Sequence, residues 1–135
     1  MNQPSPEEIE LLHGRLCTAL ADTTRIAVLY ELAEGPRHVN ALVEALGQPQ
    51  GTVSRHLRVL HQRGLVVTRR LGTRIEYRLK DRRVVAALDL MRSLLADQLD
   101  LESAKADRIR SRRKTGRGVR RSPSPKRASR KQEAS

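Results

Sequence analysis

The sequence predicts a mainly α-helical domain with one small β-hairpin. Five segments place apolar residues three and four positions apart, which is the spacing of a single helix face. One stretch, from residue 65 to residue 79, instead reads as two strands around a glycine turn. A chain of 135 residues has room for one such domain and a tail.

Two helices are expected in the first quarter of the chain. The first covers residues 6–21, where Ser5 is a suitable N-cap, and the second covers residues 23–34, where Asp22 or Thr23 can cap. The apolar stripe of the first helix consists of Ile9, Leu12, Leu16 and Leu20. Both helices therefore have one side suited to apolar contacts.

A helix-turn-helix unit is predicted next. Residues 38–46 and 49–63 form two helices, and Gly47 marks the short turn between them. The buried face of the second helix consists of Val53, Leu57 and Leu60. Its opposite side presents Gln50, Thr52, Ser54, Arg55 and Arg58.

A hairpin and a long helix follow. Residues 65–70 and 74–79 are the strands, joined by a turn at residues 71–73. The last helix covers residues 81–103, and its continuation as far as Ile109 stays open. The apolar band of that helix is broader than one seam against a small domain requires, so a second copy of the chain is its simplest partner. The complete order of elements is that of a winged helix-turn-helix.

Three segments together carry a family resemblance. Leu-Ala-Asp-Thr-Thr-Arg stands at residues 20–25, Thr-Val-Ser-Arg-His-Leu at residues 52–57, and Gly-Leu-Val at residues 64–66. In combination they are similar to the ArsR/SmtB family of bacterial repressors, and the resemblance covers residues 10–98. It implies a homodimer packed through the first and last helices. It also implies a repressor that an inducer releases from its operator.

On this resemblance, the dimer interface is expected on apolar residues of the two outer helices: Leu12, Leu16, Leu88, Met91 and Leu95. Two positions depart from the pattern of the family. Thr23 stands where Pro is frequent, and Pro49 stands where Ser commonly caps the second helix of the unit. Neither change removes the fold, although losing that cap weakens the helix by about 1 kcal/mol.

The helix over residues 49–63 is expected to enter a major groove of duplex DNA. The side chains nearest the bases are then Gln50, Thr52, Ser54 and Arg55. Arg can hold guanine, and Gln can hold adenine, with two hydrogen bonds each. Arg58 more plausibly meets a phosphate, and His56, beside the buried face, suits a structural hydrogen bond or a phosphate contact.

The hairpin offers a second basic surface. Its turn is flanked by Arg69, Arg70 and Arg74, which either approach the DNA backbone or the minor groove of an adjacent turn, or are simply solvated. Two copies of the domain would require a pseudo-palindromic operator, with half-sites about one helical turn apart or a multiple of that distance.

Most of the net charge of +12 lies at the end of the chain. Residues 104–135 hold 13 Lys and Arg but only 2 Asp and Glu, with too few apolar residues to offset the cost of ordering. We therefore expect a flexible N-terminus over residues 1–5, a folded domain over residues 6–103, and a basic, disordered tail. The tail is either a solubilising segment or a non-specific nucleic-acid arm, and the two roles are compatible.

Metal binding is not expected at the usual positions of the family. Residues 39–60 contain no Cys, and residues 81–103 contain no His. Cys17, the only cysteine, lies four residues after His13, on one face of the first helix. This pair is a possible sensor, by thiol chemistry or by metal ligation across a dimer, but a small structural Cys buried at an interface is the more common case. No cofactor is expected.

Several other classes are excluded by what the sequence lacks. There is no Phe or Trp for stacking bases, no Gly-rich phosphate loop or catalytic motif, and no apolar run of 18 residues. We therefore expect a cytoplasmic, non-enzymatic protein without membrane contact. The leading hypothesis is a homodimeric, sequence-specific repressor with an unidentified inducer. The alternatives are an architectural DNA-binding protein driven by the basic tail, and an RNA- or protein-interaction module.

Overall fold

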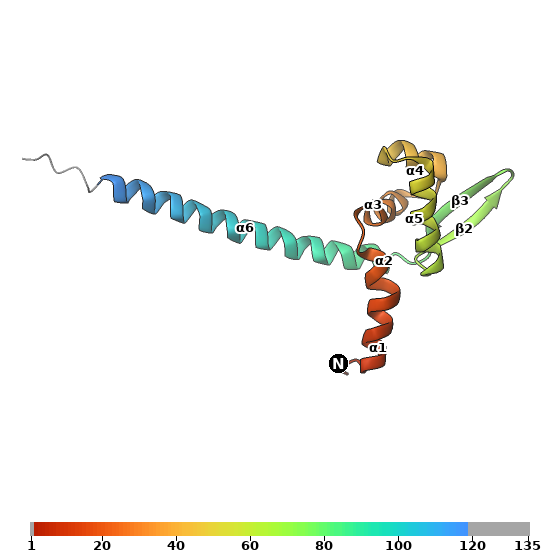
Figure 1. Cartoon of the computed structure of the whole chain (residues 1–135), viewed down its shortest axis with the longest axis horizontal. Coiled ribbons are helices and arrows are strands. Elements are labelled where there is room, and N and C mark those ends of the chain that lie inside the picture. Colours follow the sequence, from red (N-terminus) through yellow and green to blue (C-terminus); the bar gives the residue numbers. More distant parts are fainter. Residues whose placement is uncertain (1, 119–135) are drawn as a thin grey trace, which may run out of the picture. The chain divides into compact units, whose positions relative to one another are not determined.

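The computed structural model describes residues 2–118 (Figure 1). The chain divides into two units, Met1–Met91 and Arg92–Ser135, and the second unit begins inside the last helix. The predicted basic tail after residue 118 lies outside the described residues. The predicted division between residues 103 and 104, which rests on charge, stays a prediction.

The first predicted helix is continuous but contains one wide turn. It consists of α1 (Pro6–Leu11), the π-helical segment η1 (Leu12–Cys17) and α2 (Thr18–Leu20). Ser5 caps it as predicted, because its Oγ accepts the backbone N–H of Glu8 at 3.2 Å. The N–H of Thr18 donates to the carbonyl of His13, five residues back. The plain α-helix predicted over residues 6–21 is therefore wrong in its middle, which apolar spacing alone does not resolve.

The next three helices begin and end within a residue of their predicted bounds. They are α3 (Thr23–Glu34), α4 (Val39–Leu46) and α5 (Gln50–Gln62). Asp22 is the N-cap of α3, since its Oδ1 accepts the backbone N–H of Arg25 at 3.0 Å. Gly47 ends α4 with φ 63°, a left-handed conformation that glycine adopts without steric cost. The helix-turn-helix prediction is confirmed.

The sheet has one strand more than predicted. Its strands are β1 (Arg37–His38), β2 (Val66–Leu71) and β3 (Arg74–Leu79), and all pairs are antiparallel in the order β1-β3-β2. β1 pairs Arg37 with Tyr77 and His38 with Glu76. A strand of two residues shows no periodicity, so only its long-range pairing reveals it. The prediction of a hairpin alone is therefore corrected.

The hairpin turn is tighter than predicted. Leu71 pairs with Arg74, which leaves only Gly72 and Thr73 between the strands. Gly72 has φ 62° at the first central position, as a type II′ turn requires. The hairpin extends away from the helices as a wing (Figure 1).

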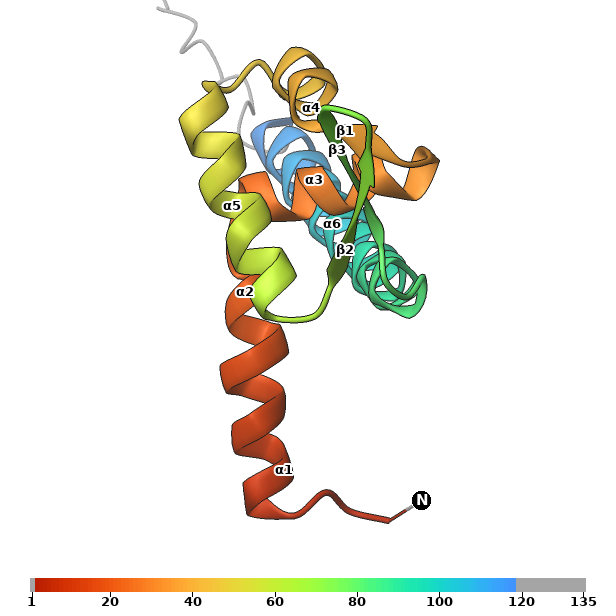
Figure 2. The same cartoon turned by 90° about the vertical axis from the view of Figure 1, so that its right-hand side faces the viewer.

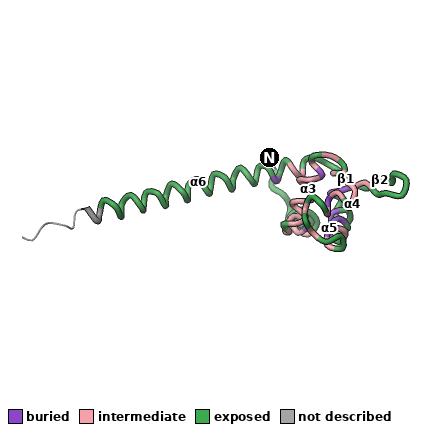
Figure 3. Tube along the Cα trace, turned by 90° about the horizontal axis from the view of Figure 1, so that it is seen from above, coloured by how far each residue is buried: buried purple, intermediate pink, exposed green. Residues whose placement is uncertain are grey.

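The core of the first unit is apolar and lies around α3. Figure 2 shows α3 between α5 and the strands, and α3 contacts both α5 and β3. Buried residues gather on these elements, whereas the tip of the wing is exposed (Figure 3). The core residues are Ala19, Val28, Leu29, Leu32, Leu42, Val53, Leu57, Leu60, Leu65, Val66 and Leu88. No residue of α1 or η1 is buried.

The last helix is longer than predicted. α6 (Arg83–Gly118) continues well past residue 103, where the sequence predicts disorder. Residues 104–115 are rich in Ala, Arg and Lys, which are strong helix formers, and extending an existing helix costs less than starting one. The predicted end was wrong because it required buried apolar surface, which a continuing helix does not need.

The Asp22 cap supports a prediction about stability. Asp22→Ala is expected to lower the free energy of unfolding by about 1 kcal/mol at neutral pH, because the first turn of α3 loses its acceptor. Asp22→Asn keeps an acceptor and is the matched control, expected to lose less. Urea unfolding of the three chains measures both values.

The same cap has a pH dependence. The hydrogen bond from the Arg25 backbone, helped by the nearby His56 and Arg25 side chains, lowers the pKa of Asp22 from its usual value of 3.8. The contribution of the ionised carboxylate is therefore fully present above pH 3.8 and is lost as pH falls through the lowered pKa. The stability difference between wild type and Asp22→Ala should shrink over that range. A difference that grows on acidification would contradict this assignment.

Candidate nucleic-acid interface

α5 has one buried and one exposed face. Its buried face consists of Val53, Leu57 and Leu60, which have no exposed surface. Three of the predicted contact residues are exposed, namely Gln50, Arg55 and Arg58. The other two, Thr52 and Ser54, are half-buried and offer less surface to a partner. Of its predicted contact residues, the helix therefore exposes two arginines and a glutamine.

Gly51 is an exposed position of α5 that the sequence prediction omitted. It stands four residues before Arg55 and seven before Arg58, so the three share one helix face. Apart from Gly51 itself, its two chain neighbours and the nearby backbone of α5, no atom lies within 4 Å of the place where a Cβ would stand. Helical spacing counted backwards from Arg55 would have identified it.

The beginning of α5 lacks a side-chain cap. Pro49 is the N-cap residue and accepts the backbone N–H of Val53 at 3.1 Å through its carbonyl. The side chain of Pro49 has no group that can accept a further N–H. The other N–H groups of the first turn therefore have no side-chain cap, and the positive end of the helix dipole is not neutralised there. This end of the helix favours an anionic partner.

The wing is basic at its tip. Arg69, Arg70 and Arg74, all three predicted as contacts, are exposed. The strand register pairs Arg70 with Ile75 and Leu71 with Arg74, so the arginines flank the two-residue turn. The structure thus places three positive side chains on a short hairpin beside α5.

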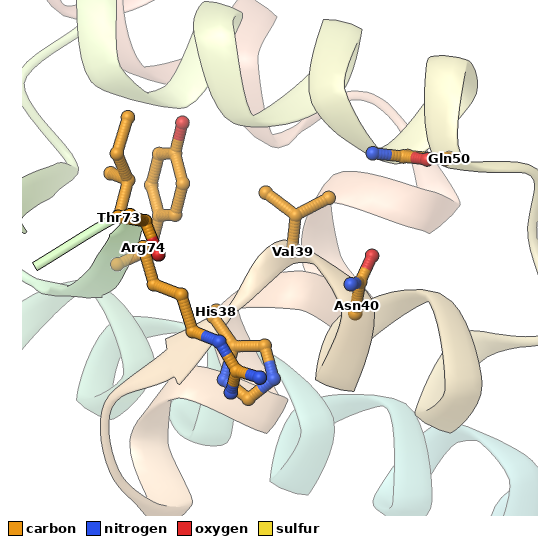
Figure 4. A pocket seen from close by; sticks show the side chains of 8 residues that line it. His38, Val39, Asn40, Gln50, Thr73 and Arg74 are labelled. Carbon is orange, nitrogen blue, oxygen red and sulfur yellow. The ribbon is translucent and has the colours of Figure 1, made fainter.

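A hollow of about 250 Å³ separates the start of α5 from the turn of the wing. Figure 4 shows Gln50 and Asn40 at one side of this hollow and Thr73 and Arg74 at the other. One predicted contact residue of the helix, Gln50, and one of the wing, Arg74, therefore border one open depression. This is the arrangement in which one duplex can reach both.

His56 lies on the inner side of α5, away from the exposed arginines. It is 8% exposed, and its Nδ1 lies 3.3 Å from Nη1 of Arg25 and 3.8 Å from Oδ1 of Asp22. Arg25 also donates from Nε to the carbonyl of Ala19 at 2.7 Å and from Nη2 to that of Thr18 at 3.0 Å. Of the two roles considered for His56, the structural hydrogen bond is the one present. Arg25, the last residue of the motif at residues 20–25, was given no role from the sequence; it joins the end of α2 to α5.

The predicted dimer residues do not all lie at the surface. Leu88 is only 5% exposed and packs in the core of its own chain, so its assignment to an interface is corrected. The other four are exposed apolar side chains: Leu12, Leu16, Met91 and Leu95. Helical spacing cannot separate these cases, because both the core and a partner require apolar residues.

The possible sensor pair is exposed. Both His13 and Cys17 lie on η1 with solvent access in the single chain. Among residues 2–118, no group of three or more His, Cys, Asp or Glu side chains is arranged to hold a metal ion. Within the same described part, no helix combines the length and the apolar character that crossing a membrane requires.

Comparison with known proteins identifies the family. The model for bacterial regulatory proteins of the arsR family matches residues 22–68, from the cap of α3 into β2. A similar solved structure from Mycobacterium bovis is described as the homodimeric winged helix-turn-helix DNA-binding domain Mb0332, a possible ArsR-family transcriptional regulator. It is 37% identical, has a TM-score of 0.57, and is matched over 73% of this chain and 92% of its own. The chain belongs to the ArsR family of bacterial regulatory proteins.

Two curated relatives of this ArsR-family chain are regulators by name. The HTH-type transcriptional repressor SmtB of Mycobacterium tuberculosis is 45% identical over 78 residues, which are 58% of each chain. The HTH-type transcriptional regulator CmtR of Mycobacterium bovis is 38% identical over 88 residues, or 64% of this chain and 75% of the relative. The match to SmtB thus spans 58% of the length of that relative. The predicted winged helix-turn-helix fold and family resemblance are confirmed.

Proposed function

We propose that this chain is a sequence-specific DNA-binding repressor that acts as a homodimer and is released by an unidentified inducer. The observation that carries the proposal is the division of α5: one face is sealed in the core, and the other presents Gln50, Arg55 and Arg58. These side chains have the donors and acceptors that read base edges in a major groove. The chain acts by binding and not by catalysis, in the cytoplasm, where bacterial DNA lies.

Each part of the interface has a role in this proposal. Arg55 and Gln50 read bases, Arg58 holds a phosphate, and the arginines of the wing hold the backbone beside the groove. The uncapped start of α5 adds N–H groups that suit a phosphate. Thr52 and Ser54 contribute less, because they are half-buried.

Two further observations support a dimer. α1 and η1 contribute no residue to the core, yet they expose Ile9, Leu11, Leu12 and Leu16. A helix with this composition is stabilised by covering its apolar side, and a second copy does so with two-fold symmetry. The similar domain Mb0332 is described as homodimeric. A two-fold dimer matches a pseudo-palindromic operator.

The proposal is tested by selecting bound sequences from random duplexes. The expected result is one enriched, pseudo-palindromic sequence. Binding with no enriched sequence would contradict the repressor function and favour an architectural role.

Arg55→Ala is expected to lower the affinity for the selected operator by about tenfold to a hundredfold, while affinity for random duplex changes much less. The reason is that a bidentate arginine contact discriminates between bases by about 1–3 kcal/mol. Arg58→Ala is the matched control, since it removes the same charge from the same exposed face. It should weaken operator and random DNA alike. Equal losses for Arg55→Ala on both DNAs would contradict its role in base reading. Titrations at fixed salt measure all four affinities.

A further inference from the structure

The charge of α6 reverses along its length. Residues 83–103 hold two basic and four acidic side chains, whereas residues 104–115 hold six basic side chains and one acidic one. Both stretches belong to one continuous helix. The positive charge of the second stretch is therefore held on an ordered helical segment, which we call the basic arm (residues 104–115).

The basic arm has no apolar seam for a protein partner. Every residue in it is exposed, and its only large apolar side chain is Ile109. Helical spacing places the charges on two lines that face different directions. One line contains Lys105, Arg108 and Arg112, and the other contains Arg110, Arg113 and Lys114. A surface that is positive on several sides and lacks an apolar anchor fits a polyanion.

The helix dipole does not account for this concentration of charge. Basic residues stabilise a helix only within its last turn, and Lys105 and Arg108 lie ten or more residues before Gly118. The spacing in fact places like charges at i and i+4, as in Arg108 with Arg112 and Arg110 with Lys114. Such pairs destabilise an isolated helix. Phosphate groups would relieve this repulsion.

We infer that the basic arm binds the phosphates of duplex DNA beside the operator and adds affinity without reading bases. This inference rests on the proposed function for its target, because α5 brings the chain to duplex DNA. The arm is about 18 Å long at 1.5 Å per residue, roughly half a helical turn of duplex. It can therefore follow several phosphates along one side of the DNA.

The test replaces the six basic residues of the arm by Gln in the full chain. Gln keeps a high helix propensity while removing the charge, and circular dichroism checks that helix content is retained. The expected result is an equal loss of affinity, at least tenfold at low salt, for operator and random duplex. The slope of log affinity against log salt should fall in magnitude by at least about 2, since each lost phosphate contact removes about 0.9. The ratio of operator to random affinity should stay within about twofold.

A matched pair of triple variants controls for net charge alone. One variant replaces three residues of the basic arm by Gln: Arg110, Arg113 and Lys114. The other variant replaces three exposed basic residues outside the arm by Gln: Arg15, Lys80 and Arg82. Only the first should reduce the salt slope clearly. Equal effects of the two triples, or an unchanged slope in the six-residue variant, would overturn the inference. A loss confined to the operator would also overturn it.

The arm and the proposed function fail in different ways. A wild-type chain that selects no sequence contradicts base reading by α5. The arm is judged separately, by the difference in slope between its variants and wild type on random duplex.

Discussion

Replacing Leu12 and Leu16 by Glu is expected to convert the proposed dimer into a folded monomer and to weaken operator binding by at least about a hundredfold. The two side chains are 51% and 38% exposed and take no part in the core, so the chain keeps its own packing. Glu has a high helix propensity, which preserves η1 and its neighbours. In a two-fold interface, by contrast, both copies carry the new charges, and burying them is costly without partner charges.

The loss of DNA affinity follows because the monomer lacks the α5 helix of a second copy. Linking two binding units raises overall affinity by about 10² to 10⁴ over one unit. Sedimentation measures the oligomeric state, and titration of the selected operator measures the affinity. Leu71→Glu is the control for oligomeric state, because Leu71 is a similarly exposed apolar residue that lies on the wing. A double variant that remains a dimer would place the interface elsewhere.

Replacing Arg25 by Ala is expected to lower the free energy of unfolding by about 2–3 kcal/mol and also to weaken operator binding. The guanidinium makes three contacts, with the carbonyls of Thr18 and Ala19 and with Nδ1 of His56. Its removal takes this donor from three partly buried acceptors, of which the Thr18 carbonyl keeps the backbone N–H of Ala21 at 3.4 Å. Each group left unsatisfied costs about 1 kcal/mol or more. Because a guanidinium only donates, this contact with His56 is a hydrogen bond only while Nδ1 carries no proton.

The effect on DNA binding arises because Arg25 joins α2 to the inner face of α5. Without Arg25, α5 loses one of the contacts that fix its position, so even the folded fraction should bind operator more weakly. Arg25→Lys is the matched control: it keeps the charge but not the forked donor geometry, and intermediate losses are expected. Urea unfolding and operator titration are measured on the same samples. Wild-type stability in Arg25→Ala would show that these three contacts contribute nothing.

The helices around the core were predictable because their start and stop signals are local. Asp22 before α3 and Gly47 after α4 act within one turn of the chain, and an apolar face follows each signal. The features that were missed depend on distant partners or on unusual local bonding. β1 is defined only by its pairing with β3. The wide turn of η1 does not change the spacing of the apolar residues, so the sequence there predicts an ordinary α-helix.

The exposure of candidate site residues was predictable where it follows from helical spacing. Gln50, Arg55 and Arg58 are exposed as the pattern indicates. Leu88 was misassigned because an apolar residue on α6 serves either its own core or a partner. Arg25 belongs to the motif at residues 20–25, but its role was missed because it consists of contacts with residues six, seven and 31 positions away, which the motif does not display.

The short strand β1 has a mechanical consequence. It runs directly into α4 and pairs with β3, the strand that continues from the wing turn. Through β1, the hairpin is therefore attached to α4, which forms the helix-turn-helix unit with α5. No free linker separates β1 from α4. Operator sequences that differ in intrinsic groove width would need different amounts of bending to contact both α5 and the wing. The affinity of this chain should therefore depend on the deformability of a site as well as on its bases.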